Sequence, residues 1–330
     1  MWPNYAFHVP NQKKLRYIVH TDCKNEADDQ FTLAHILMTD KLDVRGIIAG
    51  HFDKGNHGRY PEHQTARASL DEVNKILDLM ELTGKYPVFK GAEVGIPDEW
   101  TPIVTAAARF IVEEAMRDDP RPLYIGMQGA ITDLACAILM EPRICDRMTC
   151  IWIGGADYPL GGEEFNLMSD VHAANVVFSS SMPLWQVPTG TYKQFAVSLA
   201  ELQVRVRPYG KIGRYLFEQM VALNDSLADL PYWPHGETWC LGDEGVICAL
   251  LEDRERRGGY REVAAPWIDS DMRYLPGNSP RLIRVYESMD VRLDLEDLYA
   301  KLQINYRSQC ICPLPPSSLR SWEEHSPGSA

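Results

Sequence analysis

Short apolar runs alternate with helical patterns along the first half of the chain, and this alternation constrains the fold more than any other feature. Strand-like runs occupy residues 15–20, 42–50, 86–91, 122–127, 148–155 and 183–188. Helical patterns fill the intervals at 29–39, 62–85, 101–119, 131–140 and 170–178. Strands that alternate with helices predict an open α/β fold, in which a mostly parallel sheet is flanked by helices.

The pattern changes beyond about residue 195, where it becomes mainly helical. Helices are expected at 196–206, 211–224, 242–252 and 295–303, with one further strand at 281–287. No linker divides residues 1–307, so we predict one domain there. Residues 308–330 are rich in Ser and Pro, which favours a disordered tail.

Charge and composition exclude several classes of partner. The formal net charge is -13 and no basic stretch is present, which argues against a nucleic-acid polymer. No run of 18 apolar residues is present, so no membrane span is expected. The N-terminus lacks the pattern of a signal peptide, and most of the cysteines lie in apolar or helical surroundings typical of free thiols. We therefore expect a cytoplasmic protein.

Polar loops follow the predicted strands. In open parallel sheets, ligands bind beyond the carboxyl ends of the strands. The loops expected there read "HTD", "AGHFDKGN", "MQGAITD", "GGADYPLGGEEFN" and "VPTGTY". Together they predict a polar cup at one edge of the sheet.

The first of these loops is unusually acidic. Asp22, Glu26, Asp28 and Asp29 lie within eight positions after the first strand. Such carboxylates can hold a hard cation such as Ca²⁺ or Mg²⁺. Alternatively, Asp28 or Asp29 caps the following helix, which leaves Asp22 unexplained. Spacing alone does not separate these two uses.

Four segments in the same order resemble the nucleoside hydrolase superfamily, in particular its inosine- and uridine-preferring members. "TDCKNEADDQFTLAHIL" resembles the signature D-x-D-P-G-x-D-D, and "MQGAITDLACAIL" resembles T-G-P-L-T-N-L-A. "WIGG", "EEFN" and "DVHAANVVF" resemble the block M-G-G, E-F-N and D-P-E-A-A, and "LGDEGVICALL" resembles H-D-P-L-A-V. The resemblance runs from about residue 15 to 305 and implies a Rossmann-like core.

The resemblance also implies a function: Ca²⁺-dependent cleavage of the N-glycosidic bond of a ribonucleoside or related N-riboside. It makes Asp22 a metal ligand and the general base that activates water. The other implied metal ligands are Asp29, Asp243 and the main-chain carbonyl of Gln128. The implied ribose contacts are Asp28, Glu164 and Asn166. The family's habit of forming dimers and tetramers implies a homo-oligomer.

The acidic loop departs from the family signature. His20 replaces the first aspartate, the Pro-Gly pair is absent, and the five residues "CKNEA" separate Asp22 from Asp28 where three are usual. This "NEADD" form resembles a divergent subgroup of the family. Asn25 and Glu26 are candidates to reach the sugar or the metal; alternatively, they only reshape the turn.

The group that protonates the leaving base is the second departure. Some family members have a His before the late aspartate, where this chain has Gly242. The nearby loop "ADLPYWPHGETW" offers Trp233 to stack on a base and His235 as the acid. The alternative is that Trp233 and Trp239 are packing residues and His235 a surface residue.

The sugar contact after the second strand is the third departure. The family has an Asn there, and the equivalent here is His51 or, a little later, Asn56. We favour His51 as a substrate-binding residue.

Two other functions compete with hydrolysis of a nucleoside. The altered loop and the missing His are compatible with an inactive nucleoside- or sugar-binding protein of the same fold. A metal-dependent phosphohydrolase is the second rival, although no Gly-rich phosphate loop or Arg/Lys cluster lies near the acids.

Overall fold

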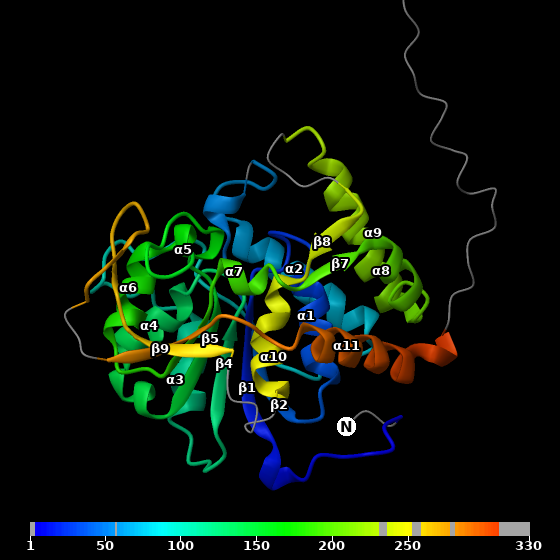
Figure 1. Ribbon diagram of the computed structural model, residues 1–330. Coiled ribbons are helices and arrows are strands. Elements are labelled where there is room, and N and C mark those ends of the chain that lie inside the picture. Colours follow the sequence, from blue (N-terminus) through cyan, green and yellow to red (C-terminus); the bar gives the residue numbers. More distant parts are fainter. Residues whose placement is uncertain (1–3, 57, 231–235, 253–258, 278–280, 310–330) are drawn as a thin grey trace, which may run out of the picture.

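The computed structural model describes residues 4–56, 58–230, 236–252, 259–277 and 281–309, and Figure 1 shows its arrangement. Its centre is an eight-stranded sheet with the order β3-β2-β1-β4-β5-β6-β12-β9. Seven of these strands are parallel, and only β9 runs antiparallel, against β12. The bounds in spatial order are β3 Val88–Lys90, β2 Leu42–Ala49, β1 Leu15–Thr21, β4 Leu123–Met127, β5 Met148–Ile153, β6 Leu184–Val187, β12 Leu282–Tyr286 and β9 Tyr260–Ala264.

Helices cover both faces of this sheet, as the alternation predicts. The first helices in chain order are α1 Asp29–Met38, α2 Thr65–Leu79, α3 Ala106–Ala115, α4 Thr132–Met140, α5 Phe165–Ser169 and α6 Val171–Ser179. The remaining helices are α7 Thr189–Tyr192, α8 Leu199–Arg205, α9 Gly210–Ser226, α10 Gly245–Leu251 and α11 Val291–Tyr306. Two small antiparallel pairs join β7 Ala196–Ser198 to β8 Thr238–Cys240, and β10 Trp267–Ile268 to β11 Tyr274–Leu275.

Each face of the sheet has its own apolar core. Successive residues of β1 point to opposite faces, so Tyr17 and Val19 pack with α1, α2, α9, α10 and α11. Ile18 packs on the other face, with α3, α4 and α6. All three side chains are fully buried. Strands buried on both faces read as continuous apolar runs, which is why β1 was recognisable in the sequence.

Some boundaries in the sequence prediction are wrong. The helix expected to end at Gly84 ends at Leu79, in a turn where Glu81 adopts a φ of 60° and the Leu82 N–H donates to the Leu77 carbonyl. This Schellman-type hydrogen bond ends a helix without glycine. The helix expected at 196–206 begins only at Leu199, because residues 196–198 form β7. The antiparallel edge strand β9 was not predicted at all.

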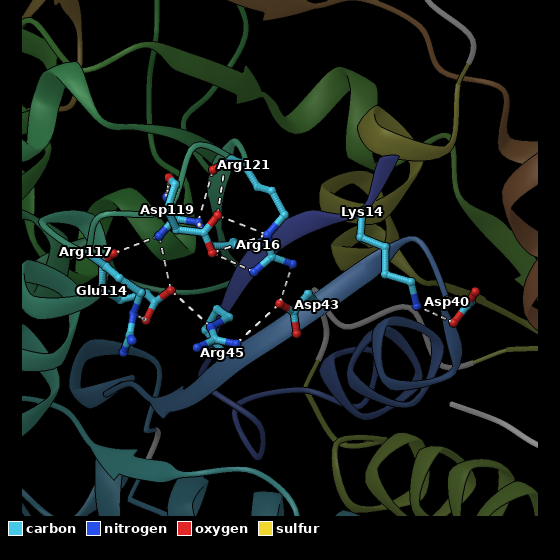
Figure 2. A network of polar contacts seen from close by, with 9 residues as sticks. All are labelled: Lys14, Arg16, Asp40, Asp43, Arg45, Glu114, Arg117, Asp119 and Arg121. Carbon is cyan, nitrogen blue, oxygen red and sulfur yellow. Dashed lines mark hydrogen bonds and ion pairs between the residues drawn. The ribbon is translucent and has the colours of Figure 1, made fainter. Parts of the chain in front are cut away.

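A network of ion pairs joins the amino ends of β1, β2 and β4, as Figure 2 shows. Arg16 is 3 % exposed and donates to Glu114 Oε1 at 3.2 Å and to three main-chain carbonyls. Arg121 donates to Asp119 at 2.6 Å and to Asp43 at 2.8 Å. These hydrogen bonds hold the pKa of the Asp119 carboxyl well below its usual range, so the acids at this edge are paired.

The described helices include none that combines the length and the apolarity needed to cross a membrane. The expected tail lies outside the described residues from residue 310 onward.

Candidate active site

A cavity of about 540 Å³ opens at the carboxyl ends of β1, β4 and β5, the opposite edge of the sheet from the network of Figure 2. Segments far apart in the sequence line it, namely the β1–α1 loop, α5, α7, β8 and the turn before α10. Its acidic lining residues are Asp22, Glu26, Asp28, Asp29, Glu163, Glu164 and Asp243, and its one basic lining residue among those described is Lys193. Four of the five loops predicted to form the cup therefore line one strongly acidic cavity, whereas "AGHFDKGN" contributes no lining residue.

Three buried aspartates meet at the floor of this cavity. Asp28 and Asp29 begin α1, and Asp243 lies in the turn Gly242–Glu244 before α10. Their carboxylate oxygens lie within 4.8 Å of one another. The Asp28 side chain makes no capping hydrogen bond to α1, and instead accepts from the Asp243 N–H at 3.3 Å. Helix capping therefore does not explain this cluster.

Asp22 lies beside this cluster, directly after β1. It is 2 % exposed, and its carboxylate accepts a hydrogen bond of 3.2 Å from Asn25 Nδ2. Gly129 leaves room for it, because a Cβ at that position would lie 2.6 Å from Asp22 Cγ. Thr21 orients the neighbouring acid by donating to Asp29 Oδ1 at 2.5 Å.

Burial and mutual repulsion change the acidity of these groups. Burial raises the pKa of Asp28 to about 6 and, with the charge of Asp28, that of Asp29 to about 7. The same causes raise the pKa of Glu26 to about 8 and the pKa of Asp22 and Asp243 well above the usual range. Within the described chain, no Lys, Arg or His forms an ion pair with Asp22, Asp28, Asp29 or Asp243.

These residues fit a bound cation. Several buried carboxylates that lack a positive partner are costly, unless they are protonated or hold a metal ion. Oxygen donors of this kind are the ligands of hard divalent cations. The cluster Asp28, Asp29 and Asp243 differs from the expected ligand set, because Asp28 takes part while Asp22 lies beside it.

The residues expected to hold the sugar also line the cavity. Asn166 donates to the main-chain carbonyl of Gln128 at 3.1 Å and to that of Ile153 at 2.9 Å. Glu164 caps α5 by accepting from Asn166 N and Leu167 N, and it accepts from Tyr192 Oη at 3.3 Å. Gln128 is 1 % exposed, and its side-chain amide has no hydrogen-bond partner among the described residues. A polar ligand in the cavity would satisfy such a group.

Histidines at two of the departures are not among the lining residues of the cavity. His51 is buried, donates to or accepts from Thr132 Oγ1 at 2.8 Å, and is not among the lining residues. Burial lowers its pKa to about 4, so its imidazole is neutral. His20 is buried and its Nε2 lies 3.1 Å from Asp133 Oδ2. The structure therefore places His51 in the core beside the loop that carries Gln128.

The other sequence candidates divide into two groups. Asn25 and Glu26 line the cavity, whereas Trp233 and His235 lie outside the described residues. Lining residues that the sequence analysis missed are Ile153, Phe165, Thr189, Tyr192, Lys193 and Ala196. Ile153 and Phe165 lie within the quoted segments "WIGG" and "EEFN", and Thr189 and Tyr192 lie within the loop "VPTGTY", whereas Lys193 and Ala196 carry no motif. Trp239, one of the aromatic residues considered, also lines the cavity.

A family model settles the relationship. The model for "inosine-uridine preferring nucleoside hydrolase" matches residues 17–303, which include every described element of the site. The chain belongs to this family. Membership does not favour the inactive binding protein or the phosphohydrolase as alternatives.

Curated members of the nucleoside hydrolase family align over shorter segments. An inosine-uridine preferring nucleoside hydrolase of Leishmania major is 32% identical over 108 residues, which are 32% of this chain and 34% of that protein. A pyrimidine-specific ribonucleoside hydrolase of Escherichia coli is 27% identical over 188 residues, 49% of this chain and 57% of that protein. The aligned segments thus span between about a third and somewhat over half of these relatives.

Solved structures of nucleoside hydrolases share the fold over almost their whole length. A plant nucleoside hydrolase has a TM-score of 0.66 at 16% identity, covering 87% of this chain and 98% of that one. A purine-preferring ribonucleoside hydrolase from Gardnerella vaginalis has a TM-score of 0.65 at 17% identity, covering 88% and 99%. These likenesses confirm the predicted fold class of open α/β sheet and mainly helical C-terminal part.

Proposed function

We propose that the protein is an N-glycosyl hydrolase that uses Ca²⁺ to split a ribonucleoside or related N-riboside into ribose and free base. The observation that carries this proposal is the cluster of buried carboxylates at the floor of the cavity, which has no cationic partner among the described residues. Membership of the nucleoside hydrolase family supports the reaction class. The size of the cavity, about 540 Å³, suits a ligand as small as a nucleoside.

Asp28, Asp29 and Asp243 would hold the cation, with Asp22 and the Gln128 carbonyl as the further ligands implied by the family. When bound, Ca²⁺ supplies Lewis-acid polarisation and neutralises part of the acidic charge. The buried acids would otherwise be partly protonated at neutral pH, because their pKa values are raised.

Asp22 is the proposed general base. Its carboxylate lines the cavity and accepts a hydrogen bond from Asn25 at Oδ2. It takes a proton from water as the water oxygen bonds to the anomeric carbon and the C–N bond breaks. Positive charge develops on the sugar, and the surrounding carboxylates stabilise it.

The remaining polar residues would bind and orient the substrate. The proposed partners of the ribose hydroxyls are Glu164, Asn166 and Asp28. The same cavity is also lined by Asn25 and Glu26. Trp239 and Tyr192 line the same cavity as these acids, and we propose that they and Trp233 contact the base. His235 stays the proposed donor of the proton to the departing base.

We further propose a cytoplasmic homo-oligomer. Six described cysteines are free thiols, which suits a reducing compartment. Light scattering on the purified protein measures the oligomeric state directly.

A panel of purine and pyrimidine nucleosides tests the function, with free base measured by chromatography in the presence of Ca²⁺ and, as control, EDTA. We expect base release that depends on Ca²⁺ and is lost on replacing Asp22 with Ala. Binding of nucleosides without release of base over long incubation would contradict the proposal.

A further inference from the structure

The loop between β1 and α1 is longer than the corresponding loop in the family signature, and its contacts indicate its role. We propose that Asn25 and Arg59 are positioning residues that hold the Asp22 carboxylate in one orientation. The inference rests on the proposed function for the role of Asp22, but its geometry is independent of the substrate.

Asn25 contacts Asp22 twice. The Asn25 N–H donates to the Asp22 carbonyl at 2.9 Å, which closes a tight turn after β1. The Asn25 side-chain Nδ2 donates to Asp22 Oδ2 at 3.2 Å. Gly129 also approaches so closely that an added Cβ would lie 2.6 Å from Asp22 Cγ and 2.9 Å from Asp22 Oδ1. The carboxylate is thus confined between an amide and a glycine backbone.

Arg59 fixes which way the Asn25 amide faces. Its Nη2 donates to Asn25 Oδ1 at 3.4 Å. A guanidinium can only donate hydrogen bonds and a carboxylate can only accept them. The amide therefore satisfies both neighbours in one orientation alone, with Oδ1 toward Arg59 and Nδ2 toward Asp22.

Arg59 is itself held rigidly. Its Nε and Nη2 donate to the carbonyls of Asn56 and Gly55, both at 3.2 Å, and its guanidinium lies 5.8 Å from the centre of the Phe52 ring. Gly55 lets Asn25 approach this loop, because a Cβ there would lie 2.8 Å from Asn25 Oδ1. The loop after β2 therefore supports the loop after β1.

A second anchor holds the other side of the inserted loop. Lys24 adopts a φ of 123°, which is unfavourable for a residue other than glycine and persists only where the surroundings enforce it. Its Nζ lies 3.4 Å from Glu72 Oε1 on α2 and 3.4 Å from Tyr215 Oη on α9. Tyr215 in turn donates to Glu72, which is 5 % exposed. The insert is thus tied to two helices as well as to Arg59.

This arrangement gives the insert a role other than a sugar contact. Groups that orient a metal ligand or catalytic carboxylate typically contribute about 10- to 100-fold to metal affinity or activity. A residue that binds the sugar would instead act mainly on KM when removed, if its contact is equally strong in the ground and transition states.

Asn25→Ala tests the proposal, with Asn74→Ala as matched control because Asn74 is exposed on α2 and far from the site in its contacts. We expect Asn25→Ala to lower kcat or Ca²⁺ affinity about 10- to 100-fold, with KM changed less than about threefold and the melting temperature of the metal-free protein nearly unchanged. Values of kcat and Ca²⁺ affinity both within about twofold of wild type, or a tenfold rise in KM at constant kcat, would overturn it.

Substitution of Arg59 provides the second, independent readout. Arg59→Met keeps an apolar contact with Phe52 but removes the donor, whereas Arg59→Lys retains a donor and should recover part of the lost kcat or Ca²⁺ affinity. If Arg59→Met and Arg59→Lys both had the kcat and Ca²⁺ affinity of the wild type, the proposed role of Arg59 would be overturned.

Calorimetric titration of Ca²⁺ into metal-free protein separates this inference from the proposed function. If wild type releases no base from any nucleoside while Asn25→Ala still loses Ca²⁺ affinity, the function fails and the positioning role stands. If wild type is active and the variant binds Ca²⁺ and turns over like wild type, only the positioning role fails.

Discussion

The acidic side chains at the two edges of the same parallel sheet differ in whether they have cationic partners. At the amino ends of the strands, each acid that Figure 2 draws contacts a Lys or Arg, and Arg16 is buried among its partners. At the carboxyl ends, Asp22, Asp28, Asp29 and Asp243 are equally buried, yet in the part of the chain that the structure describes they form no ion pair.

Strand β1 links both edges, since it begins beside Arg16 and ends beside Asp22. Arginine partners lower the pKa of Asp119 at one edge, whereas burial and like charges raise the pKa of Asp29 to about 7 at the other. A buried charge is tolerated when a partner compensates it, whereas unpaired buried acids reduce stability unless a ligand compensates them. The difference indicates which edge is structural and which is functional, and the following substitutions test it.

Replacement of Asp22 by Asn should have the largest effect. We expect kcat to fall about 10²- to 10⁴-fold, because the proposed general base is lost. Stability of the metal-free protein should stay constant or rise, because a buried like charge is removed. Chromatography of released base and thermal melting in EDTA measure the two quantities. A variant that keeps full activity would exclude the mechanism.

Replacement of Arg16 by Met should show the converse at the other edge. Arg16 and Glu114 are 3 % and 2 % exposed, and removal of one partner of a buried pair typically destabilises a protein by about 3–5 kcal/mol. Glu114 keeps Arg45 and Arg117 as partners, which favours the lower end of that range. Urea denaturation measures the loss, while kcat per folded molecule should not change. A loss of kcat without a loss of stability would contradict the structural role assigned to this edge of the sheet.

Calcium should stabilise the protein more as the pH rises. The folded-state pKa values of Asp28, Asp29 and Glu26, about 6, 7 and 8, lie above their ordinary values. Their favourable contribution is therefore fully present below pH 4 and is lost as the pH rises through 6 to 8 in the metal-free protein. Saturation with Ca²⁺ at 100 times Kd should restore about 2.7 kcal/mol.

Thermal melting at pH 5 and pH 8, each with Ca²⁺ and with EDTA, measures this effect. The increase in melting temperature caused by Ca²⁺ should be larger at pH 8, because protons no longer compete for the carboxylates. An equal increase at both pH values would contradict the assignment of the cation to this cluster.

Replacement of Arg121 by Ala should have the smallest effect. Arg121, Asp119 and Asp43 are partly exposed, and solvent screens such pairs, so we expect a loss of about 1 kcal/mol or less. Activity should be unchanged, which denaturation and the chromatographic assay together can establish. A loss of stability as large as that of Arg16→Met would show that solvent exposure does not determine how much each ion pair at this edge contributes to stability.

The sequence predicted the central sheet because its inner parallel strands, such as β1, β4 and β5, are largely buried on both faces. Residues such as Tyr17, Ile18 and Val19 form a continuous apolar run, and such runs can be recognised from the sequence alone. The edge strand β9 has mostly exposed residues and no such run, so it was missed. Helix ends depend on single turns, such as the one at Glu81, which periodicity does not encode.

Part of the site was equally readable. The spacing of Asp22, Asp28 and Asp29, together with the late Asp243, predicted a group of acids, and the structure places all four at one cavity. The contact between Asn25 and Arg59 was not predictable, because it joins loops 34 residues apart through one hydrogen bond. The surroundings of His51 were not predictable for a related reason, since its buried partner Thr132 is distant in sequence.

Calorimetric titration of Ca²⁺ into the metal-free protein at neutral pH tests the central claim most directly. We expect saturable binding to the wild type that is lost or strongly weakened in Asp29→Asn and unchanged in Asp40→Asn, whose carboxylate is paired with Lys14 at the opposite edge. Absence of saturable binding to the wild type, or equal binding by Asp29→Asn, would contradict it.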